Sequence, residues 1–281
     1  MTKGRIAFQG ELGANSHEAC VAAFPDMTPV PHATFEEAFE AIKSGDCQLG
    51  MIPVENSIAG RVADVHHLLP DSGLKIIGER FKPIHFQLMA NPGVKLEDLT
   101  TVASMPIALA QCRKVVRQLK LRAEPVGDTA LAAKLLSLNP DPTRAAISPA
   151  LAAELYGLKI LVRDIEDTHN NTTRFLIMTA EGEPPAPDHS RPCMTSFVFR
   201  VRNMPAALYK AMGGFATNGV NLTKLESYME NGAFTATFFY AEIDGRPEDR
   251  GVALAFEELQ FFSERFEILG VYPADPFRDR T

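Results

Sequence analysis

The chain has 281 residues, of which 46% are hydrophobic and 22% charged, and its formal net charge is −7. This length predicts two domains, and the composition is that of an ordinary globular protein. The acidic balance excludes a general nucleic-acid binder, and the lack of any run of about 18 apolar residues excludes a membrane-spanning helix. If such a chain binds an anion, it must build positive potential locally from Arg, Lys and backbone N–H groups.

The cysteines are scattered and form no C-x-x-C pair, which predicts buried reduced thiols and neither disulfides nor a metal site. They are Cys20, Cys47, Cys112 and Cys193. The first residues, MTKGRIAFQG, lead into a strand without the apolar core of a signal peptide, so we expect a cytoplasmic protein.

Short apolar runs alternate with helical patterns through the first part of the chain, which predicts parallel sheet covered by helices. RIAFQG predicts a strand and SHEACVAAF a helix; in TFEEAFEAI, Thr34 and Glu37 predict a capping box. LGMIPVEN predicts a strand followed by a helix from about Ser57 to Leu69. In AAISPALAAELYG, we expect Ser148 to cap a helix that Gly157 ends.

Two long stretches are expected to cross between two α/β lobes. LKIIGERFKPIHFQLMANP predicts the outward crossing and RDIEDTHNNTTRFLIM the return. The predicted first domain therefore covers residues 1–180, with one lobe at roughly 1–80 plus 164–180 and the other at 81–163. The predicted fold class is α/β, with two lobes arranged as in periplasmic binding proteins.

A linker and a second domain follow. Residues 181–192, EGEPPAPDHSRP, contain four prolines and no hydrophobic pattern, which is typical of a semi-extended linker. Residues 193–281 then predict the order β-α-β-β-α-β of a ferredoxin-like module, with ENG at 230–232 as a hairpin turn.

Four polar stretches occur where a predicted strand meets a helix: GELGANS (10–16), PVENSIAG (53–60), GDTA (127–130) and THNNTTRF (168–175). In open α/β sheets ligands bind beyond the carboxyl ends of strands, where helix N-termini favour anions. Gly10 and Gly13 would allow close backbone approach. Simple helix capping is the alternative interpretation of each stretch. The residues alone thus indicate a cleft enzyme or a binding protein for a small anion.

The combination of motifs resembles the prephenate dehydratase family with a C-terminal ACT regulatory domain. IPVENSIAGRV is similar to the family's Pro-Val-Glu-Asn-Ser segment, and NNTTRF to its Asn-x-Thr-Arg-Phe segment. GDTALAA, AAISPALAAELYGL, SMPIALAQC and NLTKLES resemble further blocks of the family. The resemblance implies decarboxylating dehydration of prephenate to phenylpyruvate in phenylalanine biosynthesis, without redox cofactor, metal or Schiff base.

The resemblance also implies roles for particular residues. Thr173 would be the catalytic hydrogen-bond donor at the departing hydroxyl. Arg174 is expected to bind a carboxylate of the dianionic substrate, because its fork matches two oxygens at once, and an ion pair at the end of the strand is its alternative role. Asn56, Ser104 and Gln111 are implied as contacts of the substrate or its leaving group. The other candidate substrate-binding residues are Ser16, Ser57 and Thr129, whose hydroxyls can donate hydrogen bonds at the strand–helix junctions, with Glu55, Thr172 and Phe175. Glu55 is repulsive to a dianion unless protonated or paired, and helix capping is its alternative role.

The ACT resemblance implies phenylalanine as effector, bound between paired modules of a homodimer or homotetramer. The regulatory residues implied are Ala206, Ala207, Leu208, Asn221, Glu226 and Ser227. Four positions depart from the family pattern: Ala206 replaces the usual glycine, Met212 replaces the usual leucine, and Tyr228-Met229 replace Arg-Pro. These departures put the identity of the effector in question.

Two alternative functions stay open. Arogenate dehydratase acts on a substrate in which an amine replaces the keto group. A small-anion binding or sensor protein could use the same two-lobed cleft. His66 and His67 are adjacent and therefore point to different faces of a helix, which favours packing or surface roles over metal binding.

Overall fold

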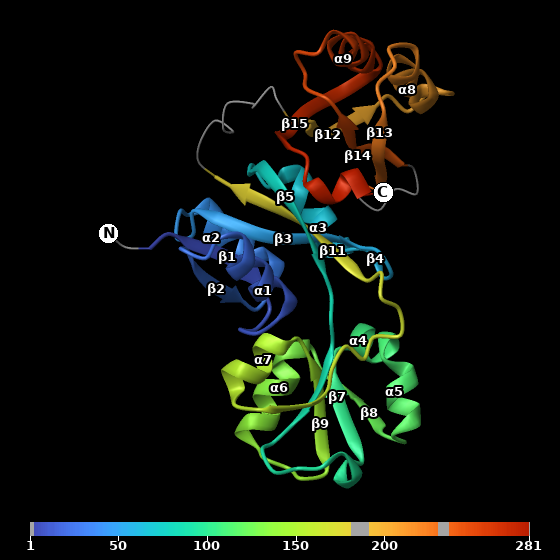
Figure 1. Cartoon of the computed structure of the whole chain (residues 1–281). Helices are drawn as coiled ribbons and strands as arrows, with labels where there is room; N and C mark the ends of the chain where they lie inside the picture. The colour runs from blue at the N-terminus through green and yellow to red at the C-terminus, as the bar shows by residue number, and fades with distance from the viewer. Residues whose placement is uncertain (1–2, 181–190, 230–235, 281) are drawn as a thin grey trace. The chain divides into compact units, whose positions relative to one another are not determined.

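The structure is a computed structural model in which residues 3–180, 191–229 and 236–280 are described. The described chain forms three β-sheets (Figure 1). It separates into two compact units, residues 1–62 with 80–175 and residues 63–79 with 176–281. The predicted linker at 181–192 lies largely outside the described residues, as does the predicted turn at 230–232. The domain boundaries proposed from the sequence stay predictions.

The first sheet has the strand order β2-β1-β3-β11-β5, and β4 pairs with β3. β1 runs parallel to both β2 and β3, as the alternating pattern predicted. Its strands are β1 (Arg5–Gln9), β2 (Thr28–His32), β3 (Leu49–Asn56), β4 (Gly60–Arg61), β5 (Lys75–Pro83) and β11 (Thr172–Thr179). The helices that accompany them are α1 (Asn15–Ala23), α2 (Phe35–Lys43), α3 (Ala63–Leu68) and the 3-10 turn η1 (Leu69–Asp71).

The predicted capping box of α2 is confirmed in one of its two bonds. Thr34 Oγ1 accepts a hydrogen bond from Glu37 N at 3.2 Å and satisfies an N–H group that a helix start leaves without an intrahelical partner. Glu37 Oε2 accepts from Ala33 N at 2.9 Å, one residue before the cap position, and not from Thr34 N.

The helix predicted from about Ser57 to Leu69 is wrong in its first half. Residues 57–59 form a turn, and β4 then folds back on the end of β3, with Asn56 opposite Gly60. Helix α3 starts only at Ala63. The sequence favoured a helix because polar residues follow a strand, but the side chain of Asn56 binds the next N–H groups and closes a turn instead.

The second sheet has the order β10-β6-β9-β7-β8. β7 is parallel to β8 and β9, whereas β6 pairs antiparallel with β9 and β10 because the chain crosses into this lobe along β6. Its strands are β6 (Gln87–Ala90), β7 (Thr101–Ser104), β8 (Arg122–Pro125), β9 (Arg144–Ser148) and β10 (Lys159–Val162). Its helices are α4 (Pro106–Gln111), α5 (Arg113–Gln118), α6 (Thr129–Leu138) and α7 (Ala150–Tyr156), with the 3-10 turn η2 (Leu96–Asp98).

The predicted boundaries of α7 are half right. Gly157 ends the helix in the left-handed conformation with φ 67°, which glycine adopts without steric cost. Ser148 does not cap the helix, because it is the last residue of β9 and Pro149 occupies the cap position. The residue before a proline favours extended backbone, and this explains why the strand continues through Ser148.

The third sheet has the order β13-β14-β12-β15 and is antiparallel throughout. Its elements are β12 (Cys193–Val201), α8 (Ala207–Thr217), β13 (Leu222–Met229), β14 (Ala236–Asp244), α9 (Arg250–Phe262) and β15 (Ser263–Pro273), followed by η3 (Pro276–Arg280). Phe197 and Phe199 of the sheet pack with Phe215 of α8 and Phe256 of α9 in one core. This is the ferredoxin-like order predicted from the sequence, and the α/β fold class is confirmed.

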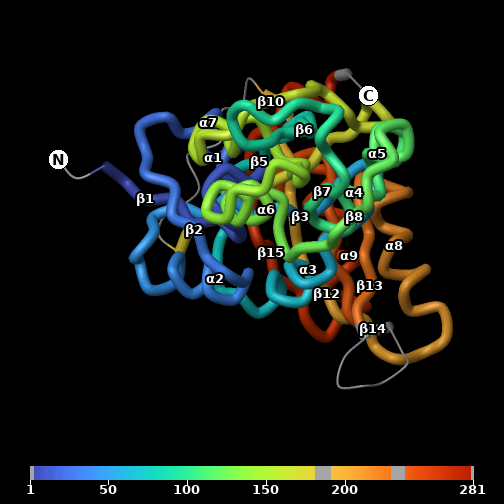
Figure 2. The backbone as a smooth tube through the Cα atoms, turned by 90° about the horizontal axis from the view of Figure 1, so that it is seen from below, coloured from blue at the N-terminus to red at the C-terminus, as the bar shows by residue number. Residues whose placement is uncertain are grey.

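Helices α1 and α7 lie side by side in both views of the chain (Figures 1 and 2). Gly13 precedes α1 with φ +94°, and a Cβ built on it would lie 2.8 Å from Ala152 Cα. Nearby, Leu151 N donates to Glu18 Oε1 at 3.2 Å, and Tyr156 Oη donates to Leu12 O at 2.8 Å. The glycine thus permits direct backbone contact between the two lobes.

All four cysteines are free and buried, which confirms the prediction of reduced thiols. Burial raises the pKa of Cys20 to about 12. Within the described ranges, no helix combines the length and apolar character needed to cross a membrane.

We expect Gly13→Ala to lower the free energy of unfolding by about 1–3 kcal/mol more than Gly93→Ala, because an overpacked site must push neighbouring atoms apart. Gly93 is a matched control, since its φ is +91° and a Cβ added there would meet no heavy atom within 4 Å. Urea denaturation of both variants measures the difference. Equal losses would mean that Gly13 is required for its backbone angle alone.

Candidate active site

Asn56 ends β3 and holds the turn that follows it. Its side-chain oxygen Oδ1 accepts hydrogen bonds from Ile58 N at 3.1 Å and Ala59 N at 2.8 Å. Only the oxygen of a carboxamide can accept from two N–H donors, so these bonds fix which end of the amide is nitrogen. Nδ2 must therefore face β11.

Thr173 receives a hydrogen bond from that nitrogen. Asn56 Nδ2 lies 3.0 Å from Thr173 Oγ1 and 2.7 Å from Asn171 Oδ1, with the carbonyl oxygen of Thr172 farther away at 3.3 Å. Because Thr173 Oγ1 accepts from Asn56, its own hydrogen stays available for another acceptor. The direction of the bond makes Thr173 a donor toward a ligand.

Asn171 extends this arrangement to the second lobe. Its Nδ2 donates to Oε1 of Gln111, the last residue of α4, at 2.9 Å. Since Oε1 is engaged in this way, the Nε2 group of Gln111 is left to donate elsewhere. We call Asn56, Asn171, Gln111 and Thr173 the amide network. It presents two hydrogen-bond donors, the hydroxyl of Thr173 and the Nε2 group of Gln111.

Ser57 fastens the start of β11 beside the network. Its Oγ donates to Asn170 O at 2.7 Å and accepts from Thr172 N at 2.9 Å. The backbone adds a bond from Ser57 N to Thr172 O at 2.9 Å. Ser57 and Thr172 are thus brought to the network, but these bonds indicate that they hold the two segments together.

Arg174 and Phe175 follow Thr173 in β11 and are both buried. The Arg174 guanidinium carbon lies 5.8 Å from the centroid of the Phe81 ring, a cation–π distance. Phe175 is 1% exposed and packs in the core. Glu55 is half-buried on β3, opposite Arg61 of β4. The structure therefore places Phe175 for packing and Glu55 within the β3–β4 pair.

Three predicted site residues lie apart from the network. Ser104 is fully buried and donates to Ile147 O at 2.6 Å, a bond between adjacent strands β7 and β9. Ser16 and Thr129 are buried in the first turns of α1 and α6. No hydrogen bond among the described residues links these three to the amide network, and their contacts with a substrate stay predictions.

The stretches GELGANS and GDTA meet at a cavity of about 490 Å³ between the lobes of the first unit. The lining residues are Gln9, Gly10, Glu11, Pro31, His32, Ala33, Gly127, Asp128, Leu131 and Lys134. Lys134 Nζ lies 2.9 Å from Glu11 Oε2, which joins the two lobes by an ion pair. The cavity supplies polar groups of both signs to a ligand.

Asp128 confirms the capping alternative for GDTA. Its Oδ1 accepts from Ala130 N at 2.8 Å and Leu131 N at 3.0 Å at the start of α6. Burial raises the pKa of Asp128, and those two backbone N–H groups partly offset the rise. Sequence reasoning quoted this segment but did not select Asp128, and likewise missed Asn171 within NNTTRF.

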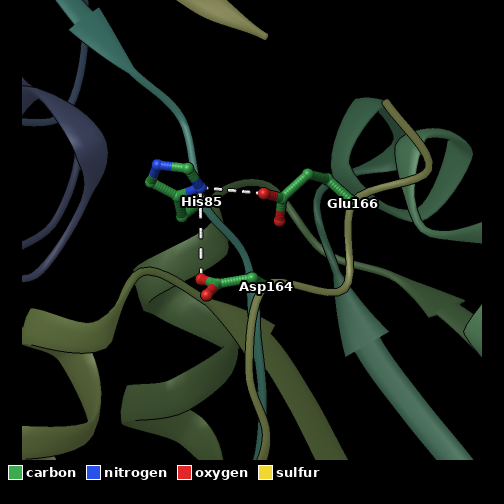
Figure 3. A group of neighbouring side chains, drawn as sticks. All are labelled: His85, Asp164 and Glu166. Carbon is green, nitrogen blue, oxygen red and sulfur yellow. Dashed lines mark hydrogen bonds and ion pairs between the residues drawn. The ribbon is translucent and has the colours of Figure 1, made fainter. Parts of the chain in front are cut away.

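A second polar cluster, also missed from the sequence, joins the two segments that cross between the lobes. Figure 3 shows His85 facing two carboxylates, with Nδ1 2.8 Å from Glu166 Oε1 and 4.0 Å from Asp164 Oδ1. Glu166 Oε2 also accepts from Phe86 N at 3.0 Å. An imidazole and two carboxylates are donors of a kind that binds divalent cations. The hydrogen bonds of Glu166 to His85 and to Phe86 N account for the arrangement without a bound cation.

Comparison with known proteins identifies the family of the chain. The sequence profile of the prephenate dehydratase family matches residues 6–183. A protein of Komagataeibacter europaeus, described as a bifunctional N-acyl-homoserine lactone acylase/prephenate dehydratase, is 48% identical over 276 residues, which cover 97% of each chain. Arogenate dehydratase 2 of Petunia hybrida is 36% identical over 285 residues, covering 96% of this chain and 72% of that protein.

Solved structures give the same result. A structure described as a novel type of quorum-quenching acylase has a TM-score of 0.92 at 47% identity and covers 98% of this chain and 99% of its own. The prephenate dehydratase of Arthrobacter aurescens in complex with L-Phe has a TM-score of 0.87 at 31% identity, with 96% and 90% covered. The profile match and the relatives over nearly the whole length show that this chain is an enzyme of the prephenate dehydratase family.

Proposed function

We propose that this chain converts prephenate to phenylpyruvate, carbon dioxide and water. The observation that carries the proposal is the bond from Asn56 Nδ2 to Thr173 Oγ1, which leaves the threonine hydroxyl free to donate. Membership of the prephenate dehydratase family supports the choice of substrate.

The reaction requires stabilisation of one departing oxygen. As the ring carboxylate of prephenate leaves as carbon dioxide, its bonding electrons enter the ring, the ring becomes aromatic, and the ring hydroxyl departs. The hydroxyl takes up one proton, ultimately from solvent, and leaves as water. A threonine hydroxyl is a weak acid, so we assign Thr173 a hydrogen bond that strengthens as negative charge grows on that oxygen.

Other residues would hold the dianion in place. Gln111 Nε2 is the second donor of the amide network and can bind an oxygen of the substrate. Arg174 is the proposed partner of a carboxylate, because its fork matches two oxygens at once. Since Arg174 is 4% exposed and stacked on Phe81, the substrate must reach a guanidinium that is already packed.

We expect Thr173→Ala to lower kcat by about 10²-fold with little change in KM, because loss of an oxyanion-type donor has an effect of that size. Phenylpyruvate release at neutral pH, followed by its ultraviolet absorbance, measures the rate against a heat-killed control. Thr173→Ser keeps the hydroxyl and should retain most of the activity. Near-normal turnover in Thr173→Ala would end the role of Thr173.

The same assay separates the alternatives. Arogenate, supplied in place of prephenate, would yield phenylalanine if the chain acts as an arogenate dehydratase. A binding or sensor protein would take up prephenate without releasing phenylpyruvate.

An acylase activity is the second candidate function. The observation that favours it is the 48% identity, over 97% of both chains, to the bifunctional relative of Komagataeibacter europaeus. Hydrolysis of an N-acyl-homoserine lactone adds water across the amide bond and gives a fatty acid and homoserine lactone. Mass spectrometry of both products decides this candidate, and no release above a no-enzyme control would remove it.

We also propose that phenylalanine regulates the chain through the C-terminal module and that the chain assembles as a homodimer or homotetramer. The phenylalanine complex of the Arthrobacter aurescens relative supports the choice of effector. Ala206, the cap residue before α8, has φ 60° and ψ 18°, a left-handed conformation that favours the glycine usual in the family. Asn221 Nδ2 donates to Asp244 Oδ2 at 2.6 Å, and Glu226 pairs with Lys224 at 3.3 Å.

Tyr228, which replaces the usual arginine of the family, has a defined place in the structure. It is 6% exposed, and its hydroxyl lies 3.1 Å from Nδ1 of His66 in α3, within the second compact unit. The replacement therefore supplies a buried contact between the module and α3. Met229 is the last residue of β13, and the structure describes its backbone only.

We expect phenylalanine to lower turnover, and Tyr228→Phe to weaken that inhibition by about fivefold, because a lost buried hydrogen bond is worth about 1 kcal/mol. Titration of phenylalanine into the phenylpyruvate assay measures this, with turnover in its absence as the control. Light scattering after size exclusion gives the oligomeric state. If millimolar phenylalanine neither inhibits nor shifts that state, the module serves assembly alone.

A further inference from the structure

Asn171 joins three segments that are far apart in the sequence. Its side chain hydrogen-bonds to Asn56 at the end of β3 and to Gln111 at the end of α4. Its backbone carbonyl oxygen accepts a hydrogen bond from Ile84 N, on the outward crossing segment, at 2.8 Å. It is 1% exposed. A buried amide with all these bonds has a single favourable orientation.

The orientation of the Asn171 amide determines the orientation of the Gln111 amide in the other lobe. Asn56 must donate through Nδ2, because its oxygen is held by Ile58 and Ala59. Asn171 accepts that bond through Oδ1, so it must donate through Nδ2 to Gln111 Oε1. With Oε1 held in this way, the group that Gln111 has left to offer a ligand is Nε2, and not an oxygen.

We propose that Asn171 is a positioning residue that fixes the carboxamide of Gln111 with its donor end toward the substrate. The inference rests on the proposed function, since it assigns a role within that same site. A reversed Gln111 would present an oxygen to an anionic substrate and would lose a donor as well. A site that is built to hydrogen-bond its substrate loses much of its catalytic efficiency when one of its polar groups faces a group that it cannot pair with.

Asn171→Asp tests this with almost no change of shape. The new carboxylate still accepts from Asn56 but cannot donate to Gln111 Oε1, so Gln111 must reverse to supply a donor. We expect kcat to fall at least about tenfold, because a donor acting in the transition state is lost. Asn170→Asp is the matched control: it adds the same charge one residue away on an exposed side chain, and kcat should stay within about twofold.

A double-mutant cycle separates positioning from folding. If Asn171 acts through Gln111, Asn171→Ala should lower kcat at least about fivefold in the wild-type chain but by less than about twofold when Gln111 is already alanine. The bond from Asn56 to Thr173 does not involve Asn171 and should persist. If the kcat reductions of Asn171→Ala and Gln111→Ala simply multiply in the double variant, the proposal is wrong. It is also wrong if Asn171→Asp has a normal kcat.

One readout does not depend on the reaction. In protein labelled with 15N-glutamine, the side-chain amide signal of Gln111, assigned by its loss in Gln111→Ala, should shift in Asn171→Asp and stay in place in Asn170→Asp. If the wild-type chain releases no phenylpyruvate, the proposed function fails, and this measurement still tests the network. An unshifted Gln111 signal would overturn the positioning role whichever reaction the chain catalyses.

Discussion

The site depends on two backbone N–H groups that hold one side-chain oxygen. Ile58 and Ala59 donate to Asn56 Oδ1, and every later bond in the amide network takes its direction from that choice. A carboxamide has an acceptor end and a donor end of nearly equal size, so shape alone would not orient it. The backbone of the turn between β3 and β4 therefore determines that Thr173 Oγ1 accepts from Asn56 and keeps its own hydrogen for another acceptor.

The network also explains how the carboxamide of Asn171 can be buried. Amide groups in a low-dielectric interior are costly unless each is bonded, and a fully bonded set specifies one arrangement. Asn171 meets this requirement with partners on β3, α4 and the crossing segment. Gln111 keeps a donor group available without placing a further charge in an acidic protein.

Much of the fold followed from periodicity, because strands and helices bury regular faces. The strand β1, the helix α2 and the βαββαβ order of the module were predicted correctly, as were the free cysteines. The site was only partly predictable. Asn56, Gln111 and Thr173 were named by resemblance, whereas the turn at 57–59 and the strand position of Ser148 depended on local hydrogen bonds and on Pro149. Asn171 is the asparagine of the quoted Asn-x-Thr-Arg-Phe segment but was not selected, because the direction of an amide hydrogen bond has no signature in a sequence.

The contact at Gly13 sets how near the two lobes of the first unit can lie on this side. A Cβ there would lie 2.8 Å from Ala152 Cα, closer than two carbon atoms can pack. Any side chain at residue 13 would therefore have to part α1 from α7, and with them the two lobes. The separation of the lobes here is thus set by the one residue type that has no side chain.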